Sequence, residues 1–107
     1  MEITRSLNDA YYVLIDPEFS FPNCYTTYDE IKTLLDQDYK VILDFSACTH
    51  IDSSALGGLF SLRKSFRGNA ELKIINANTH IYKVFQVYKL DKAITIESPS
   101  QDSSIQS

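Results

Sequence analysis

The chain has 107 residues, of which 44% are hydrophobic and 22% are charged, with three glycines and three prolines. This length and composition fit one globular domain with a single core. The formal net charge is −4, and the ten Lys and Arg residues are dispersed. The charge therefore argues against nucleic acid or an anionic membrane as the main partner.

The expected location is the cytoplasm. The first residues, "MEITRSLNDAYY", are charged and polar and lack the apolar run of a signal peptide. No later run approaches the roughly 18 apolar residues that span a bilayer. Two cysteines, Cys24 and Cys48, are too few for a disulfide framework, so reduced and partly buried thiols are expected.

The first part of the chain predicts a hairpin followed by a helix. "EITRSL" alternates in polarity, "YYVLID" is aromatic and β-branched, and the turn "NDA" between them would pair the two as antiparallel strands. The loop "DPEFSFPNC" follows. Thr27 and Glu30 then have the spacing of a capping box, which predicts a first helix from about Thr27 to Asp36.

The next segment predicts a central strand and a second helix. "YKVILDF", residues 39–45, has too many consecutive apolar residues for a strand with one wet face, so both of its faces should be buried. A helical stripe predicts a helix from about Ser54 to Arg67, with Gly68 as its C-cap. The stripe consists of Ala55, Leu59, Leu62 and Phe66.

The last part predicts two strands around a third helix. "AELKIIN" and "AITIE" have the composition of strands, and Asn78 or Thr79 would cap the helix between them. The stripe of this helix consists of Ile81, Val84, Phe85 and Tyr88. Residues 98–107 are polar and Ser-rich, as in a frayed tail.

These elements give the order ββαβαβαβ. It predicts an α/β domain over residues 1–97, with a mixed sheet and helices packed mainly on one face. Sites in such sheets collect where the carboxyl ends of strands lead into helices.

Motifs of enzymes and metal sites are missing from the sequence. It has no phosphate-binding glycine loop, no His-Glu-x-x-His and no Gly-x-Ser-x-Gly elbow. Cys48 and His50 would supply two ligands, whereas structural zinc needs four. A Ser53–His50–Asp triad with Asp44 or Asp52 is less favoured than carboxylates that bond turn amides or cap a helix. No enzymatic activity, metal or cofactor is therefore expected.

The stretch "THIDSSALGGLF", residues 49–60, is the most informative junction. Asp52 or Ser53 would cap the second helix, and a phosphate on Ser53 would lie beside unpaired backbone N–H groups. Gly57 and Gly58 would either leave one flank of the helix open to a partner or allow the helix to pack tightly on its own sheet. Local pattern favours neither reading of the glycines.

Residues 41–96 resemble the core of a STAS domain, the fold of bacterial anti-sigma factor antagonists. The resemblance rests on "DFS" at 44–46, "IDSSALG" at 51–57, "IN" at 75–76 and "YKLDKAI" at 88–94. Two features depart from the family pattern: Ala55 stands where many members have Gly, and "DPEFSFPNC" replaces a common Gly-x-Leu-Asp.

The resemblance implies a phosphorylation-controlled switch. By this resemblance, Ser53 is the position that a serine kinase would phosphorylate, and in the family this kinase often doubles as the anti-sigma factor. A PP2C-type phosphatase, or a response regulator with such activity, removes the phosphate. The implied partner-binding residues are Asp52, Ser54, Ala55, Gly57 and Gly58.

Three alternatives remain open from the sequence. The domain could be an accessory STAS subunit of a lipid-transport ABC complex, since such subunits share the fold. It could be a phosphocarrier that uses His50, which would hold an acid-labile phosphate. It could also be a structural adaptor, whose partner affinity would not change in Ser53→Asp.

Overall fold

A mixed β-sheet forms the centre of the molecule in the computed structural model, which describes residues 2–5, 10–37, 39–65 and 71–97. Within these ranges the spatial strand order is β1-β2-β4-β6-β7, where β1 pairs antiparallel with β2 and the other pairs are parallel. The strands are β1 (Glu2–Arg5), β2 (Ala10–Leu14), β4 (Lys40–Asp44), β6 (Glu71–Ile75) and β7 (Thr95–Ile96). The predicted hairpin is confirmed as a strand pair, while Asn8 and Asp9 of its turn lie outside the described residues.

The middle strand β4 is buried along most of its length. Val13, Leu43 and Ile74 align in register on three neighbouring strands, and each is fully buried. On the opposite face Ile42 is 8% exposed, between Tyr12 and Lys73 in register. The prediction that both faces of this strand are buried therefore holds for its middle residues.

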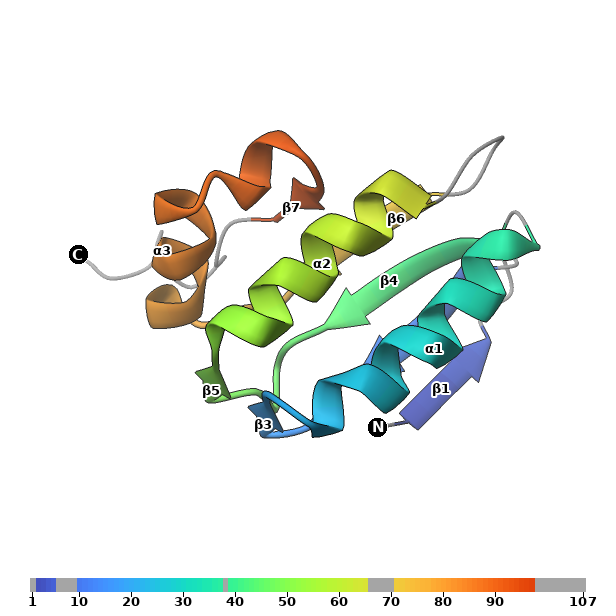
Figure 1. The fold of residues 1–107 in the computed structure, drawn as a ribbon, viewed down its shortest axis with the longest axis horizontal. Coiled ribbons are helices and arrows are strands. Elements are labelled where there is room, and N and C mark those ends of the chain that lie inside the picture. The colour runs from blue at the N-terminus through green and yellow to red at the C-terminus, as the bar shows by residue number, and fades with distance from the viewer. Residues whose placement is uncertain (1, 6–9, 38, 66–70, 98–107) are drawn as a thin grey trace.

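Within the described residues, three α-helices pack on one face of the sheet, as predicted. They are α1 (Asn23–Asp36), α2 (Ser53–Ser65) and α3 (Thr79–Val87), and a short 3₁₀-helix, η1 (Leu90–Lys92), precedes β7. Figure 1 shows α1 and α2 side by side in front of the sheet. Buried residues of all three helices belong to the same apolar cluster as Val13 and Leu43, so the domain has one core on one side of the sheet.

The predicted start of α1 is wrong. The helix begins at Asn23, one turn before Thr27, and its N-cap residue Pro22 makes no side-chain capping bond. Thr27 is 5% exposed inside the helix and therefore cannot act as its cap. Tertiary packing decides the start, because a buried stripe continues back to Cys24. The stripe consists of Cys24, Thr27, Tyr28, Ile31 and Leu35.

The other two helices agree closely with the sequence. Helix α2 begins at Ser53, one residue before the expected start, and Phe66, Arg67 and Gly68 at its predicted end lie outside the described residues. In α3, Asn78 is the cap, because its side chain accepts a hydrogen bond from the Ile81 N–H at 2.8 Å. Tyr88 was expected on the buried stripe of α3 but follows the last helical turn and is 54% exposed.

Candidate functional site

A small second sheet holds the start of α2 in place. Strand β3 (Glu18–Phe19) pairs parallel with β5 (His50–Ile51), two residues against two. The carbonyl of Pro17 also accepts hydrogen bonds from the backbone N–H groups of Thr49 and His50, at 2.8 and 3.2 Å. The loop before α1 is thereby fixed beside the loop before α2, although Pro17 and Thr49 are 32 residues apart in the chain. The sequence predicts a loop at "DPEFSFPNC" and no strand between residue 45 and the second helix, so this small sheet is not among the predicted elements.

Asp52 connects these two loops through its side chain. One carboxylate oxygen accepts a hydrogen bond from the Ala55 N–H at 2.9 Å, and the other accepts one from the Phe21 N–H at 3.1 Å. The first bond makes Asp52 the N-cap of α2, which settles the choice between Asp52 and Ser53. Both bonds favour the charged form and hold the pKa of the Asp52 carboxyl below its usual value, with the Ala55 bond as the largest cause.

We expect Asp52→Ala to lower the free energy of unfolding by about 1–2 kcal/mol, because it removes a helix cap. Asp52→Asn is the matched control: its amide oxygen still accepts from the Ala55 N–H, so its loss should be smaller. Urea denaturation of the three proteins at neutral pH measures the difference. Equal stability of wild type and Asp52→Ala would contradict this role.

The same carboxylate should make the free energy of unfolding depend on pH in the acidic range. Its pKa is lower in the folded state, so its contribution is present above the unfolded value near 3.8 and is lost as the pH falls through the folded-state pKa. The difference between wild type and Asp52→Ala should therefore shrink in that acidic range. A difference that stayed constant down to pH 2 would exclude a charged carboxylate as its source.

Ser53 and Ser54 follow Asp52 as the first two residues of α2. The Ser53 side chain is exposed, and that of Ser54 is partly buried. Backbone N–H groups in the first turn of a helix have no helical partner, and the helix dipole gives this end a partial positive charge. A phosphate on the Ser53 oxygen would therefore be reached from solvent and stabilised by the helix, in competition with the neighbouring Asp52 charge.

The two glycines of α2 have different surroundings. Gly57 is exposed, and a Cβ atom added there would have nothing within 4 Å. A Cβ added at Gly58 would overlap the ring of Tyr28 from α1. Gly58 therefore allows tight packing inside the protein. The sequence suggested packing of α2 against the sheet, whereas the close contact is with helix α1.

Tyr28 also reaches the first turn of α2 with its hydroxyl group, which donates a hydrogen bond to the backbone carbonyl of Ala55. Burial is the largest cause of the raised pKa of this phenol, so it stays protonated and able to donate. The Ala55 side chain itself is fully buried. A partner therefore cannot contact the Ala55 side chain in this structure, and Gly58 is covered on the side where Tyr28 lies. Of the residues expected to bind a partner, Ser53 and Gly57 are exposed, and Asp52 and Ser54 are partly buried.

The remaining candidate residues make structural contacts. Asp44 accepts hydrogen bonds from the Ser46 N–H at 2.9 Å and from the Asn76 amide at 3.2 Å, so it stabilises a turn, as expected. The thiol of Cys48 donates to the His50 carbonyl at 3.4 Å, and Cys24 and Cys48 are free and buried. Among the described residues, no three His, Cys, Asp or Glu side chains lie together as a metal site would require. Nor is any helix within those ranges long and apolar enough to cross a bilayer.

Sequence reasoning missed three aromatic residues near this site, namely Phe21, Tyr25 and Tyr28. The burial of Tyr28 could have been predicted, since Tyr28 lies four residues after Cys24 on the buried stripe of α1. Phe21 and Tyr25 are exposed, and their rings meet edge to face with centroids 5.4 Å apart. No local pattern identifies such a pair, because Phe21 belongs to a loop that long-range contacts, among them the β3–β5 pairing and the Pro17 carbonyl bonds, place beside Asp52.

The chain matches one protein family and is similar in fold to several solved structures. A comparison with curated protein sequences finds no relative. The fold is similar to unphosphorylated SpoIIAA, an anti-sigma factor antagonist, with 15% identity, a TM-score of 0.70 and coverage of 97% of this chain and 93% of that one. It is similar to a putative anti-sigma factor antagonist from Thermotoga maritima, with 18% identity, a TM-score of 0.78 and coverage of 96% and 91%.

A third solved structure is SpoIIAA of Bacillus in its phosphorylated form, with 17% identity, a TM-score of 0.65 and coverage of 94% and 93%. At these identities the structures establish the shared fold. The sequence model of the STAS domain matches residues 3–103, which is nearly the whole chain. The resemblance read from residues 41–96 is therefore confirmed, and the chain belongs to the STAS domain family.

Proposed function

We propose that the protein is an anti-sigma factor antagonist whose activity is switched by phosphorylation of Ser53. The observation that carries the proposal is an exposed serine hydroxyl at the first residue of α2, directly after the carboxylate that caps this helix. Membership of the STAS family and the fold shared with SpoIIAA, which was solved with and without its phosphate, support the proposal. The protein acts in the cytoplasm as the substrate of other enzymes.

In the unphosphorylated state the start of α2 binds the anti-sigma factor, which is also the serine kinase. The Ser53 oxygen attacks the γ-phosphorus of the ATP held by this kinase, ADP leaves, and the hydroxyl proton passes to a base of the kinase. A PP2C-type phosphatase or a phosphatase-bearing response regulator hydrolyses the phosphoserine and restores the first state.

Phosphorylation would separate the partners by electrostatics. Phosphoserine adds a charge of about −1.5 to −2 at neutral pH. This charge would lie next to the Asp52 carboxylate, so docking would bury two neighbouring negative groups. Desolvation and repulsion together need to supply only about 1.4 kcal/mol for each tenfold loss of affinity.

The test compares Ser53→Ala and Ser53→Asp as immobilised baits in a lysate of the source cells. We expect Ser53→Ala to recover the anti-sigma factor and Ser53→Asp to recover at least about tenfold less, the scale of one buried like-charge contact. Ser54→Ala is the matched control, because it removes the adjacent hydroxyl without blocking phosphorylation at Ser53. Equal recovery of every protein by the two Ser53 variants would contradict the switch and favour a structural adaptor.

The chemistry of the bound phosphate separates the remaining alternatives. Phosphoserine survives acid, whereas phosphohistidine does not. Label from γ-³²P-ATP that is acid-stable in the wild type and missing from Ser53→Ala is the expected result. Acid-labile label that is lost in His50→Ala would indicate a phosphocarrier. Recovery of an ATPase and a permease with both Ser53 variants would indicate an accessory subunit of a transport complex.

A further inference from the structure

Two exposed aromatic side chains form a pair beside the phosphoacceptor junction. Phe21 is 58% exposed and Tyr25 is 55% exposed, and they contact each other instead of the core. Large aromatic side chains bury 150–250 Å² and dominate the energetics of interfaces. A pair that is left in solvent at this position is therefore a candidate anchor for a partner.

A groove between α1 and α2 continues from this pair. It has a volume of about 300 Å³, and Tyr25, Tyr28, Gly58 and Leu62 supply its mainly apolar wall. At its floor the Tyr28 ring occupies the space that a side chain at Gly58 would take. We call the surface of Phe21, Tyr25, Tyr28, Gly58 and Leu62 the aromatic groove. It has room for an apolar side chain of another protein.

The aromatic groove is joined to the start of α2 through Asp52. The backbone N–H of Phe21 donates to one oxygen of this carboxylate, while the Ala55 N–H in the first turn of α2 donates to the other. Ser53 directly follows Asp52 in the chain and lies two residues before Ala55. The backbone of Phe21 therefore lies next to the residue before Ser53, and a partner docked at Ser53 would lie close to the loop that carries Phe21.

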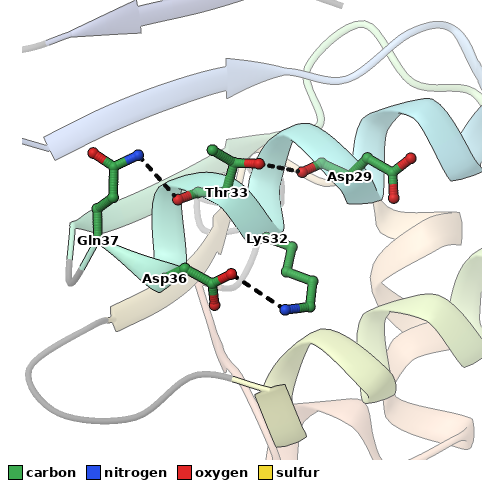
Figure 2. Close-up of polar contacts among 5 residues, drawn as sticks. All are labelled: Asp29, Lys32, Thr33, Asp36 and Gln37. Atoms are coloured by element: carbon green, nitrogen blue, oxygen red, sulfur yellow. Dashed lines mark hydrogen bonds and ion pairs between the residues drawn. The ribbon is translucent and has the colours of Figure 1, made fainter.

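Within the described part of the chain, three charged side chains lie at the aromatic groove, namely Asp29, Lys32 and its ion-pair partner Asp36, and together they carry one net negative charge. Asp29 lines the groove from α1. Lys32 is the one cation among the described residues that line the groove, and it is paired with Asp36 at 3.2 Å. Figure 2 shows the Lys32 and Asp36 side chains on the side of α1 that faces α2, away from Thr33 and Gln37. A partner complementary to this rim carries Lys or Arg.

We propose that the aromatic groove binds the anti-sigma partner by taking up one apolar side chain that is flanked by Lys or Arg residues. This inference rests on the proposed function, because it concerns the same partner, and it adds the residues outside α2 that hold that partner. Phosphorylation then acts at one edge of the interface, while the aromatic groove supplies the apolar contacts.

The test uses Tyr25→Ser and the matched control Tyr88→Ser. Tyr88 is 54% exposed but follows α3, so both variants remove an equally exposed tyrosine from different surfaces. The probe is the purified protein that the wild-type chain captures, identified by mass spectrometry and titrated by calorimetry. We expect Tyr25→Ser to weaken binding at least about tenfold and Tyr88→Ser to weaken it less than about twofold. Binding should also weaken as salt is raised from 50 to 500 mM.

The outcomes separate this inference from the proposed function. A difference between Ser53→Ala and Ser53→Asp, together with unchanged binding by Tyr25→Ser, would overturn the groove and leave the switch. Loss of binding in Tyr25→Ser with no difference between the Ser53 variants would keep the groove and overturn the switch. A wild-type dimer that Tyr25→Ser dissociates would assign the groove to a second copy of the chain, and failure to capture any specific protein would contradict both proposals.

Discussion

Replacement of Phe19 by alanine is expected to lower the free energy of unfolding by about 3–5 kcal/mol. Phe19 is 2% exposed, and its ring meets those of Tyr28 and Phe45 edge to face, with centroids 5.4 and 5.8 Å apart. Phe45 in turn meets Phe85 of α3 at 5.5 Å. The substitution would remove the ring that joins α1 to this aromatic chain and leave a cavity where β3 pairs with β5.

The matched control is Phe21→Ala, two residues later in the chain. Its ring is 58% exposed and contacts Tyr25, so its loss should cost less than about 1 kcal/mol. Denaturant titration of both variants, with far-ultraviolet circular dichroism as the signal, gives the comparison. Similar losses for the two phenylalanines would show that the Phe19 ring does not stabilise the core as described.

Alanine substitutions at the two glycines of α2 are expected to have opposite effects on stability. Gly57→Ala should raise the free energy of unfolding by up to about 1 kcal/mol, since alanine is the better helix former and the added Cβ meets open space. Gly58→Ala should lower it by about 1–3 kcal/mol, because the added Cβ displaces the buried ring of Tyr28 and its hydrogen bond to Ala55.

A double-mutant cycle tests the cause of the loss at Gly58. In a Tyr28→Ala background the ring is missing, so adding Gly58→Ala should be neutral or stabilising. A loss that persisted without the ring would point to another contact. Gly57→Ala has a second use: if the start of α2 contacts the partner closely, this variant should be more stable yet bind the partner more weakly.

Much of the fold could be predicted from local pattern. The order of the main strands and helices, the central position of residues 39–45 and the Asn78 cap all follow from short-range rules of period, capping and burial. The start of α1 could not be predicted in this way. The capping box at Thr27 satisfies a local rule, but the burial of Cys24 and Thr27 overrides it.

The candidate site was predicted in part. Asp52 as a helix cap was within reach of the sequence, because Asp before a helix is a common cap. The second bond of Asp52, to Phe21, spans 31 residues. It depends on the pairing of β3 with β5, which no local sequence pattern predicts. The different surroundings of Gly57 and Gly58 depend on where one tyrosine of α1 points, which is a property of the packed helices and not of either segment alone.

The sharing of the Asp52 carboxylate between two loops has a consequence for recognition. A peptide with the sequence "THIDSSALGGLF" contains the serine and its neighbours, but it lacks Pro17, Phe21 and Tyr28, which orient them in the folded protein. The proposed phosphoacceptor is thus positioned by three stretches of chain, namely the loop before α1, α1 itself and residues 49–60. We therefore expect a kinase that acts on Ser53 to recognise the folded domain, because unfolding removes this arrangement while the local sequence stays the same.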